Sequence, residues 1–145
     1  RSVSGRLTCL QFIQLNKSEQ TVSMTTPFLN WFEIPVLEFY RAKAFYEYVF
    51  QTELTISALG AYTMGFFPTG SGPSGSIVQG EGYQPSVFGP RLYLNCNPDL
   101  QVFVDRALEA GGKLVVPKML ITEEVGYVSF ILDCEGNALA FHSLS

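Results

Sequence analysis

The stretch NWFEIPVLEFYRAKAFYEYVF, residues 30–50, decides how this chain folds. In its first part, apolar residues alternate with Trp31, Glu33 and Pro35, which is typical of a strand with one buried face. A strand that runs directly into an amphipathic helix usually packs the helix on its apolar face, so we expect Glu33 on the opposite face. The later part has apolar residues at helical spacing: Ala42, Phe45, Tyr46, Val49 and Phe50.

The composition indicates one globular domain with a sizeable core. The chain has 145 residues, of which 47% are hydrophobic and 15% charged. The net charge is −4 and the lysines and arginines are scattered, which argues against a nucleic-acid partner because phosphate binding needs a basic patch. The sequence contains no apolar run of about 18 residues, so no membrane-spanning helix is expected.

Neither the cysteines nor the N-terminal segment of the sequence suggests a functional site. Cys9, Cys96 and Cys134 match neither a zinc spacing nor a disulfide framework, which favours a reducing, cytoplasmic location. Residues 1–23 differ in pattern from the rest, and we expect them to be a leader, disordered or appended. A single domain is then expected over residues 24–145.

The pattern of the opening stretch starts again at Arg91. Residues 91–96 predict a strand that carries Arg91, Tyr93 and Asn95 on one face. Asn97 and Pro98 are suited to be the N-cap and the first residue of a second helix. Three strands are expected after each helix, at 53–59, 61–67 and 75–79 in the first half and at 113–116, 126–133 and 137–143 in the second.

The chain therefore reads as two βαβββ modules, about residues 28–80 and 90–145. We expect an α+β fold in which each module forms an open, mostly antiparallel sheet with its helix on one face. The opposite faces would curve round a shared cavity, bordered by the long loop of residues 80–90.

Three segments carry a resemblance to a known family: RAKAFYEYVF (41–50), NPDLQVFVDRALEAGGKLV (97–115) and DCEGNALAFHS (133–143). They resemble the vicinal oxygen chelate superfamily, which includes glyoxalase I, extradiol dioxygenases and bleomycin resistance proteins. The runs NWFEIPV, GEGYQPS and LYLNC are more narrowly similar to a bacterial glyoxalase-like subgroup. The resemblance implies two βαβββ modules forming a curved mixed sheet around a cavity, and a homodimer.

The resemblance also implies a divalent metal held at strand positions that correspond here to Trp31, Gln79, Arg91 and Ala140. Of these side chains only Gln79 could serve as a ligand, and it would be a weak one. Metal sites of this kind need several imidazole or carboxylate groups, so one amide does not make a site. The sequence therefore predicts no metal and no other cofactor. One alternative is an atypical metal site that uses Glu33 and His142.

The remaining candidate site is polar and aromatic. Glu33 and His142 are the candidate catalytic residues, as an acid and base of which the first would orient the second. A purely structural interpretation pairs Glu33 with Arg91 as an ion pair. The expected ligand-binding residues are Trp31, Gln79, Tyr83, Arg91, Tyr93 and Asn95.

Two functions fit this pattern. The first is a metal-free protein that binds a small molecule without changing it. The second is an enzyme, either a lyase or isomerase that uses Glu33 and His142, or a dioxygenase-type enzyme with an atypical metal site. The fold alone does not choose between them, since one scaffold hosts many chemistries.

Overall fold

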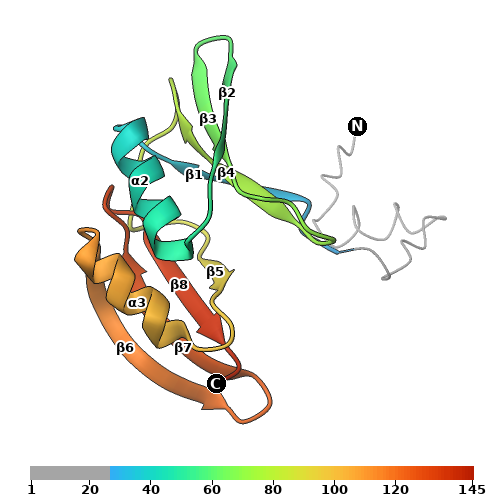
Figure 1. Ribbon diagram of the computed structural model, residues 1–145, viewed down its shortest axis with the longest axis vertical. Helices are drawn as coiled ribbons and strands as arrows, with labels where there is room; N and C mark the ends of the chain where they lie inside the picture. The colour runs from blue at the N-terminus through green and yellow to red at the C-terminus, as the bar shows by residue number, and fades with distance from the viewer. Residues whose placement is uncertain (1–26) are drawn as a thin grey trace, which may run out of the picture.

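The computed structural model describes residues 27–145, and the expected leader at 1–23 lies outside the described residues. Figure 1 shows two helices on one side of two sheets. The first module comprises β1 (Trp31–Pro35), α2 (Phe39–Phe50), β2 (Thr55–Leu59), β3 (Tyr62–Phe66) and β4 (Ser74–Gln79). The second comprises β5 (Leu92–Asn95), α3 (Leu100–Glu109), β6 (Lys113–Thr122), β7 (Gly126–Leu132) and β8 (Ala138–Ser143).

The two modules have the same topology. The first sheet has the order β1-β4-β3-β2 and the second the order β5-β8-β7-β6. In each, the first and last strands of the module pair in parallel and the remaining pairs are antiparallel. The predicted α+β fold of two βαβββ modules is confirmed, as two mixed four-stranded sheets.

One hydrophobic core joins the modules. The buried cluster includes Ile34, Phe45 and Val49 from the first module and Val104 and Phe141 from the second. The two helices contact each other beside the sheets, which leaves the opposite sheet faces free of helices. No helix among residues 27–145 is long and apolar enough to cross a membrane.

The N-terminus of α2 is capped by side chains from elsewhere in the chain. Its own N-cap residue, Glu38, makes no side-chain cap. Instead, Glu135 Oε2 accepts hydrogen bonds from the backbone N–H groups of Leu37 at 2.7 Å and Glu38 at 3.4 Å. Gln79 Oε1 accepts from the N–H of Phe39 at 2.9 Å. The N-terminus of α2 is therefore capped jointly by β4 of its own module and by the turn before β8 of the second module.

That turn, residues 133–137, is built on the buried carboxylate of Asp133. The carboxylate accepts from the backbone N–H groups of Glu135 at 2.8 Å and Asn137 at 2.9 Å. It also accepts from the Tyr46 hydroxyl at 2.5 Å and from Asn137 Nδ2 at 2.9 Å. Asn137 Nδ2 reaches further, to the carbonyl of Pro35 at 2.8 Å. The turn thus contacts both β1 and α2 of the first module.

The start of the second helix differs from the prediction. Its N-cap is Asp99, whose Oδ1 accepts from the N–H of Gln101 at 3.0 Å, and Asn97 and Pro98 precede the helix. Asn97 serves another purpose, because its Oδ1 accepts from the N–H of Leu144 at 2.8 Å. Asn97, which was predicted as the N-cap, therefore holds the segment after β8 in place.

Strand β6 is longer than predicted, running to Thr122 through Pro117. It is the outer strand of its sheet, and its pairing with β7 shifts register between Val116 and Met119. A proline without an N–H is tolerated at an edge and at a bulge, so it does not end this strand.

We expect Tyr46→Phe to lower the free energy of unfolding by about 1–3 kcal/mol, because it leaves a buried carboxylate short of one donor. Tyr46 is fully buried and Asp133 is 3% exposed. Urea denaturation measures the change. The matched control is Tyr48→Phe on the same helix, where the hydroxyl donates to Glu109 at the exposed surface. Equal losses in the two variants would contradict the role given to Asp133.

We expect Glu135→Gln to weaken the fold by roughly 1–2 kcal/mol at neutral pH. Burial raises the pKa of Glu135, but hydrogen bonds from Arg41 and from the N-terminus of α2 outweigh it and hold this pKa below 4.5. A lowered folded-state pKa stabilises the fold above the unfolded-state pKa, and this contribution disappears as the pH falls through the folded value. The difference in the free energy of unfolding between wild type and variant, measured by urea denaturation, should therefore disappear at acidic pH. Glu53→Gln, on the surface, should show no such difference.

Candidate functional site

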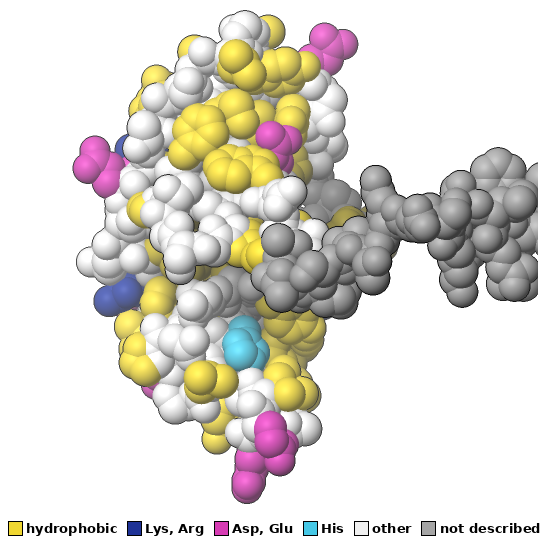
Figure 2. Space-filling view, turned by 90° about the vertical axis from the view of Figure 1, so that its right-hand side faces the viewer, with side chains coloured by type: hydrophobic (Ala, Val, Ile, Leu, Met, Phe, Trp, Pro, Cys, Tyr) yellow, Lys and Arg dark blue, Asp and Glu magenta, His cyan; other side chains and the backbone are white. Residues whose placement is uncertain are grey.

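The helix-free face of the first sheet gathers aromatic side chains around an acid. Strand pairing places Glu33 beside Ser76, and Ser76 beside Phe66, in one row on this face. Trp31 lies on the same face, with its ring 5.7 Å from that of Phe66. Figure 2 shows an acidic side chain among large hydrophobic ones on this side of the molecule. The acid is thus set among apolar rings.

Tyr83 completes this group from the loop after β4. A turn joins the N–H of Tyr83 to the carbonyl of Gly80 at 3.2 Å and brings the Tyr83 ring 5.8 Å from that of Tyr62. The Tyr62 ring occupies the space that a side chain would need at Gly80, since a Cβ there would lie 2.1 Å from it. Glycine at this position therefore sets how closely the loop approaches the sheet.

The Tyr83 hydroxyl donates a hydrogen bond to Glu33 Oε2. This hydrogen bond raises the pKa of Tyr83, and burial and the charge of Glu33 add to the shift. Tyr83 is therefore a neutral donor near pH 7. We call Trp31, Glu33, Tyr62, Phe66 and Tyr83 the aromatic–acid cluster.

A second polar group lies on β5 and its neighbours. Strand pairing sets Tyr93 beside Ala140 and Asn95 beside His142, so these residues share one face of the second sheet. The Arg91 guanidinium lies over the Phe130 ring at 4.7 Å from its centroid, a cation–π contact. Arg91, Tyr93 and Asn95 are therefore brought together as the sequence suggested.

His142 is bound within its own module. Its Nε2 lies 2.6 Å from the carbonyl of Val125, at the turn between β6 and β7. A carbonyl only accepts hydrogen bonds, so this ring nitrogen carries the proton. The histidine therefore ties its strand to a neighbouring turn.

The expected partnerships of Glu33 are not formed. The ion pairs of the described part of the chain join Arg41 to Glu135, Lys43 to Glu47 and Lys118 to Asp99, and none involves Glu33 or Arg91. The hydrogen bonds of Glu33 and of His142 also go to different residues. The proposed ion pair is therefore wrong, and no acid–base pair is assembled here.

A pocket between the modules has a volume of about 680 Å³. It lies between β1 and β5, and Arg91, Tyr93 and Asn95 line one side of it. The lining from the first module is mostly apolar and includes Phe32, Phe50 and Phe67. We call it the seam pocket. Its size is that of sites for drug-sized molecules.

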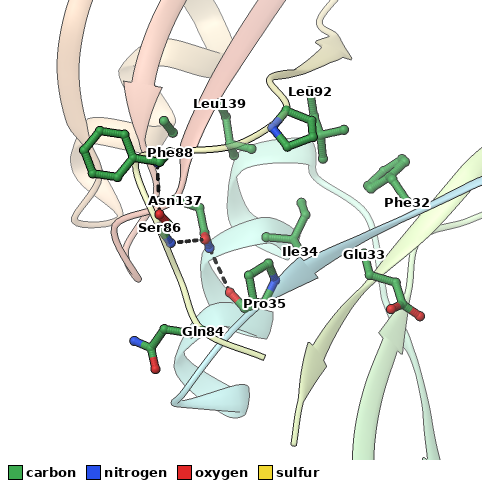
Figure 3. Close-up of a pocket in the computed structure, with 12 residues that line it drawn as sticks. Phe32, Glu33, Ile34, Pro35, Gln84, Ser86, Phe88, Leu92, Asn137 and Leu139 are labelled. Atoms are coloured by element: carbon green, nitrogen blue, oxygen red, sulfur yellow. Dashed lines mark hydrogen bonds between the residues drawn. The ribbon is translucent and has the colours of Figure 1, made fainter. Parts of the chain in front are cut away.

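A neighbouring pocket of about 400 Å³ shares Phe32 and Leu92 with it. Figure 3 shows that its polar groups bond to each other: the Ser86 N–H donates to Asn137 and Asn137 donates to Pro35. The Glu33 carboxylate points away from the apolar side chains in this view. The polar groups here hold the loop to the turn at 133–137, so this pocket has fewer groups free for a ligand.

The residues do not fit a family-type metal site. Among residues 27–145, no three His, Cys, Asp or Glu side chains lie close enough to hold a metal ion. Gln79, which alone of the four corresponding side chains could ligate, accepts from the N-terminus of α2 instead. The neighbours of Glu33 along its row, Ser76 and Phe66, add no carboxylate or imidazole.

The two cysteines in the described part of the chain, Cys96 and Cys134, offer no nucleophile. Burial raises the pKa of Cys96 to about 12. Burial also raises the pKa of Cys134 to about 12, together with the charges of Asp133 and Glu135. The reactive form of cysteine is the thiolate, so both thiols are inert at neutral pH.

Several residues of these sites were not singled out from the sequence. Tyr62 and Phe66 belong to the aromatic–acid cluster, and alternation along residues 62–66 does place them on one face. That signal says nothing of which strand lies next to them. Of the phenylalanines in the seam pocket, Phe32 and Phe50 were expected on apolar faces and Phe67 only as part of a strand.

Neither a protein-family model nor a curated protein matches the sequence. Solved structures match the fold. A glyoxalase I variant from Zea mays matches with a TM-score of 0.62 at 15% identity, over 79% of this chain and 44% of that one. A glyoxalase/bleomycin resistance protein/dioxygenase family enzyme from Burkholderia phytofirmans gives 0.60 at 16%, over 80% and 98%. A glyoxylase/bleomycin resistance protein/dioxygenase domain from Frankia gives 0.61 at 17%, over 83% and 98%. The chain has the vicinal oxygen chelate fold.

The vicinal oxygen chelate fold was expected from the sequence and is confirmed. The chain spans less than half of the Zea mays protein and nearly all of the two bacterial ones. Identities this low establish architecture only. Function therefore has to be argued from the residues of the site.

We expect divalent metal ions to leave the melting temperature of the protein unchanged, because residues 27–145 supply no donor set for them. Differential scanning fluorimetry with Ni²⁺, Zn²⁺, Mn²⁺ and Mg²⁺, and again with a chelator, measures this. Metal analysis of protein purified without an affinity tag is the companion experiment. One equivalent of bound metal per chain would contradict this expectation.

Proposed function

We propose that this protein binds a small organic molecule in the seam pocket without the help of a metal. The observation that carries the proposal is that Arg91, Tyr93 and Asn95, which the sequence singled out as ligand-binding residues, line one pocket of about 680 Å³. Pockets for organic ligands combine apolar walls with a few polar groups that fix orientation, and this pocket has both.

The chemistry of the lining suggests the ligand class. The guanidinium of Arg91 and the side chains of Tyr93 and Asn95 can bind an anionic or oxygen-rich group. Phe32, Phe50 and Phe67 from the first module suit a planar apolar body. An aromatic carboxylate has both features.

A homodimer is part of the proposal. Strand β6, at the outer edge of its sheet, exposes large apolar side chains: Leu114, Val115, Met119, Leu120 and Ile121. Apolar patches of this kind on a sheet often mark interfaces between chains. We also propose a reducing, cytoplasmic location, which the free thiols of Cys96 and Cys134 support.

Binding is tested with anilinonaphthalene sulfonate, an anionic aromatic dye that fluoresces in apolar pockets, and with aromatic carboxylates that displace it. We expect Arg91→Ala to weaken dye binding by about tenfold, since a charge-assisted contact of ~1.4 kcal/mol corresponds to that factor. Lys113→Ala, which removes the same charge from β6 outside the pocket, should bind the dye like wild type. Equal affinities of the Arg91→Ala variant and wild type would refute the proposed site. Circular dichroism confirms that each variant is folded.

A further inference from the structure

The aromatic–acid cluster on the first sheet takes no part in the seam pocket, apart from the shared strand β1. Its one formal charge is the carboxylate of Glu33, and this carboxylate forms none of the ion pairs among the described residues. One of its oxygens accepts from Tyr83. The other has no partner among the hydrogen bonds of residues 27–145. Within residues 27–145 the negative charge is therefore not paired with a positive one.

The rings around this charge are held in place. The Trp31 and Phe66 rings contact each other on one side, and those of Tyr62 and Tyr83 meet edge to face on the other, at an interplanar angle of 74°. Trp31 and Tyr62 keep 38% and 36% of their surface exposed, so solvent reaches them. Large aromatic side chains that stay exposed around an acid need a reason other than core packing.

The floor of the cluster has one unsatisfied polar atom. Ser76 lies between Glu33 and Phe66 in the same row and is fully buried. Its hydroxyl has no hydrogen-bond partner within the described part of the chain. Leaving a buried polar group without a partner costs free energy, so this row of the sheet is not arranged for stability alone.

We propose that the aromatic–acid cluster binds the ammonium group of a small organic cation. A cation over the faces of tryptophan and tyrosine is attracted by the ring quadrupoles, and this attraction grows when water is displaced. The Glu33 carboxylate supplies the opposite charge, and Tyr83 fixes its orientation. Arrangements of this kind recognise ammonium groups that carry apolar substituents, because the rings cover the substituents while the acid faces the charge. The proposal goes beyond binding in the seam pocket and can fail independently of it.

Choline is a suitable probe, and 3,3-dimethylbutan-1-ol is its neutral isostere. Trp31 is the only tryptophan of the chain, so its fluorescence reports on this cluster alone. We expect choline to change the Trp31 emission with a saturable dependence on concentration. The neutral alcohol should bind at least about tenfold more weakly. Saturation-transfer NMR of the choline methyl protons provides a second measurement that does not depend on the fluorophore.

Glu33→Gln keeps the shape of the side chain and an oxygen for Tyr83 but removes the charge. We expect it to weaken choline binding at least about tenfold. The control is Glu81→Gln, which removes the same charge from an exposed residue of the neighbouring loop. Anilinonaphthalene sulfonate binding in the seam pocket should be the same in both variants, which separates this proposal from the function proposed above.

Three results would overturn the proposal. The first is that choline and its neutral isostere bind equally well. The second is that Glu33→Gln binds choline like wild type or like Glu81→Gln. The third is that Trp31 emission changes with protein concentration and not with choline, which would assign this face to a second copy of the chain.

Discussion

The buried carboxylate of Asp133 is the constraint on which the arrangement of the two modules depends. A buried carboxyl group is tolerated only when hydrogen-bond partners surround it. Here the donors come from its own turn and from Tyr46 of the other module. The first module therefore supplies one of the donors that stabilise the buried Asp133. In the same turn, Glu135 and Asn137 form hydrogen bonds to the start of α2 and to β1. The same turn thus fixes the spacing between β1 and β5.

Both pockets follow from that spacing. β1 and β5 are edge strands of separate sheets, and no ladder joins them. The turn at 133–137 and the core contacts of the helices set the distance between the two strands. Because their backbones do not pair, a gap remains between them, and side chains line it. Phe32 and Leu92 line both pockets. The seam pocket is therefore a product of how two duplicated units dock, and neither unit alone contains it.

Local periodicity was enough to predict the fold and the faces of the strands. The alternation along residues 31–36 correctly separated Glu33 from Ile34, and the repeat of the pattern from Arg91 predicted the second module. Local periodicity could not predict which side chains from distant parts of the sequence contact each other. One interpretation paired Glu33 with Arg91 because both were assigned to cavity faces. Glu33 instead contacts Tyr83 in the loop that follows the first sheet, through the turn at Gly80, and Arg91 lies over Phe130 of its own module. A strand pattern shows which way a side chain points, whereas the identity of its neighbour depends on turns and register. The same limit explains the misplaced N-cap, since Asn97 is engaged by a residue 47 positions away.

The capping of α2 by Glu135 has a consequence for the order of folding. The residues that this contact joins are separated by 98 positions, and Tyr46 and Asp133 by 87. During synthesis, the first helix therefore emerges long before the groups that satisfy its N-terminus and its buried tyrosine. Contacts so distant in sequence must close a long loop before they contribute any stability, which slows folding. The first module is thus expected to reach its final state only once residues 133–137 have left the ribosome, although it is made before the second module.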